Sequence, residues 1–240
     1  AFNIPNDTLW PSLWNMPKIG WDNYYGLGTP VSTPIVSIID TGVLSTHSDL
    51  SGIVTNGYNA ITGTTNATDD NGHGTHVSGI VSAVINNNTG ITGLSRSTIL
   101  PIKVLDSAGS GTYGDIASGI VWATDHGARI INMSLGGSSN SITLQNAVNY
   151  ALNKGVSVVA AAGNSGTNQI FYPAGYAGVL AISASDSNDQ LASFSNFGSN
   201  IFVAAPGVGI ASTYLNNGYA NMSGTSMAAP HVAGLLAIAL

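Results

Sequence analysis

The sequence contains no cysteine, and this absence excludes disulfides, thiol catalysis and zinc sites built on cysteine. Charged residues are also scarce: they make up 7% of the 240 residues, against an average of about 25% in soluble domains. Lysine and arginine together number five and form no basic run, so the sequence predicts no nucleic-acid partner. No apolar run approaches the ~20 residues that a membrane-spanning helix needs, so we expect no membrane partner.

The chain does contain enough apolar residues for one well-filled core. Hydrophobic residues make up 44% of the sequence, and a length of 240 residues suits a single domain. No internal repeat or linker divides the chain, so we expect one domain over residues 1–240. Three of the four tryptophans fall within residues 1–30, and we expect this segment to form an irregular arm packed on the body. A surface rich in Ser, Thr, Asn and Gly favours a secreted protein.

After this arm, short apolar runs alternate with amphipathic segments. Predicted strands cover 35–39, 99–105, 129–134, 156–162, 179–185 and 201–205, and predicted helices cover 77–85, 116–126 and 143–154. Gly127 and Gly155 directly follow two of these helices, at a position where glycine often ends a helix. This alternation is typical of an α/β fold, and we expect three layers: a mostly parallel central sheet with helices on both faces.

Three of the predicted strands end in polar or glycine-rich residues. Asp40 follows the first strand, the Ser-Leu-Gly-Gly run at 134–137 follows another, and Gly163 and Asn164 follow a third. The carboxyl ends of parallel strands lie at one edge of a sheet, and ligands bind at that edge. The sequence therefore predicts a site there.

One serine, Ser226, lies between a Gly-Thr turn and a small apolar run that can begin a helix. Free N–H groups at a helix N-terminus could stabilise an oxyanion beside this hydroxyl. A serine nucleophile also needs a base and a group that orients the base. His73, in Asn-Gly-His-Gly-Thr-His, and Asp40, in Asp-Thr-Gly, can supply them. Asn164 can add a side-chain N–H donor to the oxyanion site.

Each of these residues has a plainer explanation when it is taken alone. Asp-Thr-Gly is more often a turn or half of an aspartic protease site, but the motif does not occur twice. His73 and His76 could bind a metal, but no third strong ligand lies nearby, and His76 is better explained by packing. Ser226 alone could cap a helix, and Asn164 alone could form an Asx turn. Only their combination favours catalysis.

Five sequence blocks, in this order, resemble the subtilisin-like serine proteases, or subtilases. The blocks lie at residues 38–43, 73–77, 132–137, 161–164 and 224–234, and the similarity extends from about residue 5 to the end. The resemblance implies that Asp40, His73 and Ser226 form a catalytic triad, and that Asn164 and the Ser226 amide form an oxyanion hole. It also implies the three-layer subtilisin-like fold, and similarity to thermitase-type members implies thermostability.

The family resemblance also implies which residues would hold an extended polypeptide substrate. They are Gly109, Ser110, Gly111, Tyr113, Ile116, Ser134, Leu135, Gly136, Gly137, Ala161, Ala162 and Gly163. In the family, two of these segments flank the peptide as strands, and the glycines allow close backbone approach. The set contains no acidic residue, so we expect broad specificity with a preference for large apolar or aromatic residues at P1, directly before the cleaved bond.

A structural calcium ion, Ca²⁺, is a further implication of the resemblance, and it would tie the N-terminal arm to the body. Its ligands would be the side chains of Asp7, Asp49 and Asn87 and the backbone carbonyls of Val84, Thr89 and Ile91. Such a set is close to the six to eight oxygen ligands that calcium prefers. The alternative is a solvated asparagine-rich loop. Asp69 and Asp70 could form a second, weaker site.

As a subtilase, the chain would be a secreted, extracellular and monomeric serine endopeptidase that folds with the help of its own propeptide. Family members usually continue well past the helix that carries the serine, so we expect the family's C-terminal segment after residue 240 to be absent from this chain. That expectation leaves an alternative function, a subtilase-fold binding module with impaired catalysis. A protease for one precursor with basic cleavage sites would need acidic subsites, which the predicted pockets lack.

Overall fold

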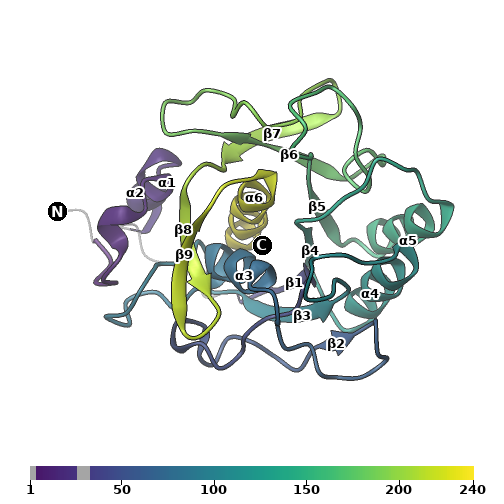
Figure 1. Ribbon diagram of the computed structural model, residues 1–240. Helices are drawn as coiled ribbons and strands as arrows, with labels where there is room; N and C mark the ends of the chain where they lie inside the picture. The colour runs from purple at the N-terminus through teal and green to yellow at the C-terminus, as the bar shows by residue number, and fades with distance from the viewer. Residues whose placement is uncertain (1–3, 26–32) are drawn as a thin grey trace.

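The computed structural model describes residues 4–25 and 33–240, and seven strands of this part form one twisted, parallel central sheet (Figure 1). The strands are β1 (Ile35–Asp40), β2 (Tyr58–Asn59), β3 (Thr98–Lys103), β4 (Ile130–Met133), β5 (Ser157–Ala161), β6 (Leu180–Ser185) and β7 (Ile201–Pro206). Their spatial order is β2-β3-β1-β4-β5-β6-β7. The order changes direction at β1, which pairs with both β3 and β4. Ligands bind at such switch points, outside the carboxyl ends of the strands.

Helices cover both faces of this sheet. They are α3 (His73–Ser82) and α6 (Thr225–Ala239) on one face, and α4 (Tyr113–Asp125) and α5 (Ile142–Asn153) on the other (Figure 1). Neighbouring strand residues point to opposite faces. Accordingly, Ile38 belongs to the buried core that includes Val77 of α3, whereas Ile39 belongs to the core that includes Ile120 of α4. The expected three-layer α/β fold is confirmed.

The six predicted strands are present as β1, β3, β4, β5, β6 and β7, and the three predicted helices as α3, α4 and α5. The main difference lies at the start of α3, which begins at His73 rather than at residue 77. Gly72 precedes this helix with a φ of 106°, a conformation that favours glycine. A Cβ atom there would also collide with the ring of Tyr214. The polar residues of the first turn carry no apolar periodicity, so the sequence pattern missed them.

A two-stranded antiparallel hairpin was not predicted. It consists of β8 (Ile210–Tyr214) and β9 (Gly218–Met222), and it lies against α3. Asn216 and Asn217 form its turn with φ values of 57° and 55°, a left-handed conformation that asparagine tolerates. The hairpin carries side chains that reach α3: the hydroxyl of Ser212 donates to the carbonyl of His76 over 2.6 Å.

The N-terminal arm is more regular than expected. Where an irregular arm was predicted, the structure has three short helical segments, η1 (Trp10–Ser12), α1 (Asn15–Lys18) and α2 (Trp21–Tyr25). They pack on the α6 side of the sheet, where Met16 and Trp21 are buried in the core. The ring N–H of Trp21 also donates to the carbonyl of Leu94 over 2.7 Å. Residues 1–3 and 26–30 of the predicted arm lie outside the described residues.

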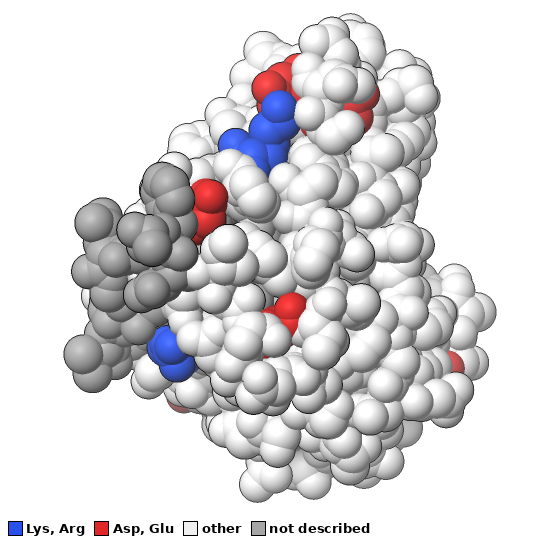
Figure 2. All heavy atoms as spheres, turned by 90° about the vertical axis from the view of Figure 1, so that its left-hand side faces the viewer, with Lys and Arg blue, Asp and Glu red and all other residues white. Residues whose placement is uncertain are grey.

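Charged side chains are sparse on the surface drawn in Figure 2. Blue and red atoms occur there in small, separate groups, and no large area carries a single sign of charge. Within residues 4–25 and 33–240, no helix combines the length and the hydropathy that crossing a bilayer requires.

Candidate active site

Asp40 and His73 meet at the carboxyl edge of the sheet. Asp40 is the last residue of β1 and is fully buried, and His73 is the first residue of α3. The Nδ1 atom of His73 lies 2.7 Å from Oδ1 of Asp40. A carboxylate only accepts hydrogen bonds, so this contact puts the proton of a neutral imidazole on Nδ1. The Nε2 atom is then left as the basic nitrogen.

The electrostatics of this pair favour a charged imidazole. Burial of His73 would by itself lower its pKa, but the negative charge of Asp40 and the hydrogen bond to it outweigh burial, and Asp69 adds to their effect. The net result is a His73 pKa above the ordinary value of 6.5. The site can therefore stabilise the imidazolium that forms when His73 accepts a proton.

Ser226 is the second residue of α6, and the end of β4 holds it in place. Its hydroxyl donates to the backbone carbonyl of Ser134 over 3.1 Å. In return, the Ser134 hydroxyl donates to the backbone carbonyl of Ser226 over 2.7 Å and accepts a hydrogen bond from the Asn132 amide. No hydrogen bond joins Ser226 to His73 in the part of the chain that the structure describes. Nucleophile–base hydrogen bonds are often long without substrate and tighten when it binds.

Asn164 lies beside Ser226 with its amide group oriented by Thr225. The Oδ1 atom of Asn164 accepts hydrogen bonds from the backbone N–H of Thr225, at 2.8 Å, and from its hydroxyl, at 2.9 Å. Because the oxygen is engaged there, the NH₂ group is the free end of the amide. Asn164 and Ser226 line the same cavity, so the NH₂ group is available at the place where a developing oxyanion would need it.

Two cavities of about 480 and 250 Å³ adjoin these residues, and Leu135 and Gly136 line both of them. All but one of the predicted substrate-binding residues are found there. The larger cavity is lined by Gly109, Ser110, Gly111, Tyr113, Ile116, Ser134, Leu135, Gly136 and Gly137, and also by His73, whereas the smaller one is lined by Ala161, Gly163, Asn164 and Ser226. The exception is Ala162, which is 2% exposed and lines neither cavity. It belongs to the core instead, because its N–H donates to the Ile182 carbonyl of β6.

The structure adds aromatic residues that the sequence patterns did not point to. Phe171 lines the smaller cavity and Tyr172 the larger one. Tyr172 also exchanges two backbone hydrogen bonds with Gly137, at 3.0 and 2.8 Å, so the 171–172 segment forms part of the cleft wall. Their only sequence signal is the aromatic pair before Pro173 in an otherwise polar loop, and such a pair has no fixed spacing to the catalytic blocks.

This geometry agrees with a match to a known family model. Residues 32–240 match the model described as the subtilase family. The chain belongs to the subtilase family. Among curated relatives, this subtilase is 50% identical to "Thermophilic serine proteinase" of Bacillus sp. (strain AK1) and 48% identical to "Thermitase" of Thermoactinomyces vulgaris. The matches cover 98% and 96% of this chain, and 59% and 83% of those relatives.

A solved structure shares the fold of this subtilase. The crystal structure of a cold adapted subtilisin-like serine proteinase matches with a TM-score of 0.80 and 36% sequence identity. The match covers 89% of this chain and 77% of the other. Thermophilic and cold-adapted proteins thus both occur among the similar proteins.

The residues expected to bind calcium in this subtilase are gathered at one place. Asp7 in the arm accepts hydrogen bonds from the backbone N–H groups of Asn86, at 3.1 Å, and Asn87, at 3.0 Å. Asp49 accepts from the Asn87 side chain, at 2.7 Å, and from the Ile91 N–H, at 2.9 Å. Asp7 and Asp49 are 3% and 0% exposed. The arm, the 48–50 turn and the 84–91 loop therefore converge around two buried carboxylates.

This cluster fits a bound cation. Burial raises the pKa of Asp49, and the charge of Asp7 adds to this effect. A cation bound between the two carboxylates would offset the cost of burying their negative charges. The carbonyls of Val84, Thr89 and Ile91 accept no hydrogen bond from any residue that the structure describes, which leaves them free as ligands. Among the described residues, no group of three or more His, Cys, Asp or Glu side chains is placed to hold a metal ion. The proposed calcium site does not require such a group, because it would consist of two carboxylates and otherwise neutral oxygen ligands.

The second calcium site suggested at Asp69 and Asp70 does not fit the structure of this subtilase. Asp70 forms an ion pair with Lys103 over 2.7 Å, so a cation is already present there. Asp69 is surrounded by N–H and O–H donors, including both the amide and the hydroxyl of Thr75. A metal ion at Asp70 would meet the positive charge of the Lys103 ammonium, which repels it, and we withdraw this site.

Proposed function

We propose that this subtilase is an active serine endopeptidase in which Ser226, His73 and Asp40 act as the triad. Its family and its relatives, which are named as serine proteinases, support the enzyme class. The observation that carries the triad is the 2.7 Å contact between buried Asp40 and His73. His73 lines the larger cavity and Ser226 the smaller one, and the two cavities share Leu135 and Gly136. A buried carboxylate placed in this way orients the base and stabilises its cation.

In the proposed mechanism, Ser226 Oγ attacks the carbonyl carbon of the peptide bond while Nε2 of His73 takes the hydroxyl proton. The tetrahedral intermediate collapses, the C–N bond breaks, and His73 gives that proton to the leaving amine. Water then attacks the acyl-enzyme while His73 takes its proton; the ester C–O bond breaks, His73 gives the proton to Ser226 Oγ, and the acid product leaves. Asp40 stays ionised throughout.

The oxyanion of each intermediate would be held by the backbone N–H of Ser226 and the NH₂ group of Asn164. The two hydrogen bonds from Thr225 support this role, because they fix the amide so that its donor end faces the cavity. A donor that is oriented before the reaction needs no reorganisation when charge develops on the substrate oxygen.

The substrate would be an extended polypeptide whose P1 side chain enters the smaller cavity. That cavity has walls of Leu135, Ala161 and Phe171, and neither cavity is lined by an acidic residue. We expect hydrolysis of peptides with P1 Phe or Leu to exceed that of peptides with P1 Lys or Asp in kcat/KM. A peptide series that differs only at P1 measures this, and a higher kcat/KM for Lys than for Phe would contradict the assignment.

The remaining parts of the proposal concern the state of the protein. We propose a structural Ca²⁺ held by Asp7, Asp49 and Asn87 with the carbonyls of Val84, Thr89 and Ile91, where it would stabilise the arm against the body. The thermophilic relatives support a thermostable protein. Secretion, action as a monomer and folding with the help of a propeptide are proposed by analogy with the family.

The alternative is a subtilase-fold binding module with impaired catalysis, and the absence of a Ser226–His73 hydrogen bond among the described residues favours testing it directly. The test is labelling with a fluorophosphonate, which phosphonylates an activated serine. We expect one covalent adduct on Ser226 and none on Ser226→Ala. A folded wild-type protein that forms no adduct and hydrolyses no peptide would establish the alternative.

A further inference from the structure

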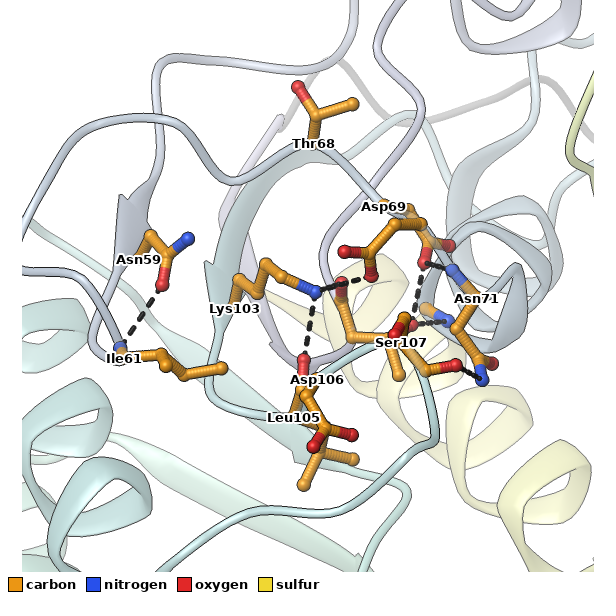
Figure 3. A network of polar contacts seen from close by, with 12 residues as sticks. Asn59, Ile61, Thr68, Asp69, Asn71, Lys103, Leu105, Asp106 and Ser107 are labelled. Atoms are coloured by element: carbon orange, nitrogen blue, oxygen red, sulfur yellow. Dashed lines mark hydrogen bonds and ion pairs between the residues drawn. The ribbon is translucent and has the colours of Figure 1, made fainter.

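A second buried carboxylate, Asp69, lies beside the Asp40–His73 pair, and the mechanism above does not use it. Asp69 is 4% exposed. Its Oδ1 accepts hydrogen bonds from the Thr41 hydroxyl at 2.8 Å and from the backbone N–H groups of Asn71 and Gly72 at 3.0 and 2.9 Å. Its Oδ2 accepts the N–H and the hydroxyl of Thr75, at 2.9 and 2.6 Å. Figure 3 shows this carboxylate among the residues of the 68–71 loop and the 105–107 segment.

These five hydrogen bonds connect the two elements that carry Asp40 and His73. Thr41 directly follows Asp40 at the end of β1, whereas Asn71, Gly72 and Thr75 surround His73 at the start of α3. The Thr41 hydroxyl also accepts a hydrogen bond from the N–H of Gly74, at 2.9 Å. Asp69 and the Thr41 hydroxyl thus bridge β1 and α3 next to the Asp40–His73 contact. Asp69 itself lines neither cavity, so it does not contact substrate.

The charge of Asp69 is not neutralised by a cation, in contrast to that of its neighbour Asp70. Lys103 pairs with Asp70 and donates its other hydrogen bonds to the carbonyls of Thr41, at 2.7 Å, and Leu105, at 2.9 Å. Among the described residues, no ion pair includes Asp69. Burial would raise the pKa of Asp69, but the hydrogen bonds from Gly72, Thr75 and Asn71 outweigh burial and lower it. Asp69 therefore carries its full negative charge at neutral pH.

That charge acts on His73. The titratable groups that face His73 are Asp40 on β1, Asp69 on the preceding loop and His76 on the same helix. Both carboxylates raise the pKa of His73. His76 is buried and its pKa is lowered to about 4, so it is neutral when the base works. Asp69 and Asp40 are thus the two charges that favour the imidazolium.

We propose that Asp69 is a positioning residue of the catalytic base: it holds the end of β1 and the first turn of α3 in register, and its fixed negative charge supports the His73 imidazolium. This proposal rests on the proposed function, because it takes His73 as the base. It adds to the three side chains of the triad a fourth, which acts through His73 without touching substrate.

The first test is kinetic and uses Asp69→Asn, which keeps the size and one acceptor oxygen but removes the charge and the second acceptor. We expect kcat to fall by up to about 100-fold, the loss that misplacing a catalytic group by about 1 Å can cause. KM should change little, because Asp69 lies outside the cleft. The acid limb of the pH profile of kcat/KM, which reports the His73 pKa, should move to lower pH.

A matched control is Asp125→Asn. Asp125 is an exposed residue at the C-terminal end of α4, away from the carboxyl edge of the sheet, and it accepts one hydrogen bond from Tyr150. The control removes the same charge from the molecule, so its pH profile should match that of the wild type. An Asp69→Asn enzyme with wild-type kcat and an unmoved acid limb would overturn the proposal.

A second variant separates position from charge. Thr41→Val removes the hydroxyl that bridges Asp69 and Gly74 but keeps both carboxylates. We expect a lower kcat with the acid limb retained, and rescue of kcat by Thr41→Ser, which restores the hydroxyl. If Asp69→Asn fails to fold, comparing Thr41→Val with Thr41→Ser still tests whether the bridge between β1 and α3 positions His73. Equal kcat values for Thr41→Val and Thr41→Ser would then overturn the positioning role.

The final test does not depend on turnover. In Ser226→Ala protein, the His73 ring is titrated by NMR with and without Asp69→Asn. We expect a lower His73 pKa in the double variant, together with a weaker low-field Nδ1 proton signal. If the wild-type protein hydrolyses no peptide but this difference appears, the proposed function fails and the action of Asp69 on His73 stands. If peptides are hydrolysed and the two titrations coincide, the charge role of Asp69 fails alone.

Discussion

The amide of Asn164 is oriented by a neighbouring residue, and its proposed role depends on that orientation. Asparagine has a donor end and an acceptor end, and nothing in its own sequence position decides which end faces a substrate. Thr225 sets the orientation of the amide, because its backbone N–H and its hydroxyl both donate hydrogen bonds to Oδ1 of Asn164. Thr225 directly precedes Ser226 in α6, so the residue that orients the proposed oxyanion donor is the chain neighbour of the proposed nucleophile.

Replacing Asn164 tests this arrangement. We expect Asn164→Ala to lower kcat by about 10² to 10³, a magnitude taken from the corresponding change in subtilisin itself. KM should stay close to that of the wild type, because the donor acts on charge that develops only in the transition state. Steady-state kinetics with one peptide substrate measure both parameters.

Asn164→Asp separates the two ends of the amide. Aspartate still accepts both hydrogen bonds from Thr225, but it replaces the donor with a negative oxygen that repels the oxyanion. The loss in kcat should therefore be at least as large as for Asn164→Ala. An exposed neighbour in the same loop, Asn168→Ala, serves as the control and should keep wild-type kcat. An active Asn164→Asp enzyme would show that the donor end has no part in catalysis.

At the scale of the elements, the sequence predicted the parts of the fold whose residues are buried on both sides. Strands such as β1 and β5 are continuous apolar runs, because helices cover both faces of the sheet. The hairpin β8–β9 was missed because its second strand, Gly218–Met222, is mostly half-buried and carries no apolar alternation. The Asn216-Asn217 pair was the one feature of this segment that could have predicted a tight turn between two strands. The helical arm was missed because its segments are only three to five residues long.

The same contrast holds for the site. The positions of Asp40, His73, Asn164 and Ser226 near one another at the carboxyl edge of the sheet could be predicted, because each lies close to a strand or helix end within a distinctive block. From the sequence, Asp69 could be interpreted only as a possible metal ligand. No sequence pattern shows that five hydrogen-bond donors surround its carboxylate. Long-range contacts of this kind depend on how loops pack after the sheet has formed. They cannot be predicted from local periodicity.

The 84–91 loop is the element whose stability we expect to depend on calcium. If Ca²⁺ joins this loop to Asp7 and Asp49, a chelator should lower the temperature of thermal unfolding, because an ion that binds only the folded state stabilises it. The gain is about 2.7 kcal/mol when the free ion is at 100 times its Kd. Calorimetry on Ser226→Ala protein, which cannot digest itself, measures the shift with and without excess calcium.

Asp49→Asn should reduce this dependence on calcium, because it removes one of the two buried charges that favour the ion. Asp125→Asn is again the control, since that residue lies on α4 and outside the 84–91 loop, and it should respond to chelator as the wild type does. Equal unfolding temperatures in chelator and in calcium for the wild type would speak against the site and in favour of a solvated asparagine-rich loop.

At the scale of the whole molecule, two of the three fully buried histidines, His76 and His231, lie on the helices α3 and α6. His76 on α3 lies 3.1 Å from the carbonyl of Ile210 and 3.0 Å from that of Ala220, both in the hairpin. His231 on α6 lies 2.8 Å from the Asn15 amide of the arm. Each histidine therefore joins a helix to a separate outer element. Burial lowers the pKa of each to about 4.

These histidines predict that stability falls in mild acid. Their folded-state pKa of about 4 lies below the unfolded value of 6.5, so between these values the unfolded chain binds more protons and unfolding is favoured as pH drops. Each can cost up to about 3 kcal/mol across that window, at about 1.4 kcal/mol per pKa unit. His73, whose pKa is raised, acts in the opposite direction and offsets part of the loss.

Urea unfolding of Ser226→Ala protein at pH 7 and pH 4.5 measures the effect as a change in the free energy of unfolding. We expect a lower value at pH 4.5, and a smaller difference between the two pH values in His76→Gln or His231→Gln, because each variant has one fewer group to protonate. His126→Gln, at an exposed position on the opposite layer, should leave the difference unchanged. If both buried-site variants kept the full wild-type difference, carboxylates rather than these histidines would control acid unfolding. Protonation of His76 and His231, which join the hairpin and the arm to the helices, would then not be the step that starts acid unfolding.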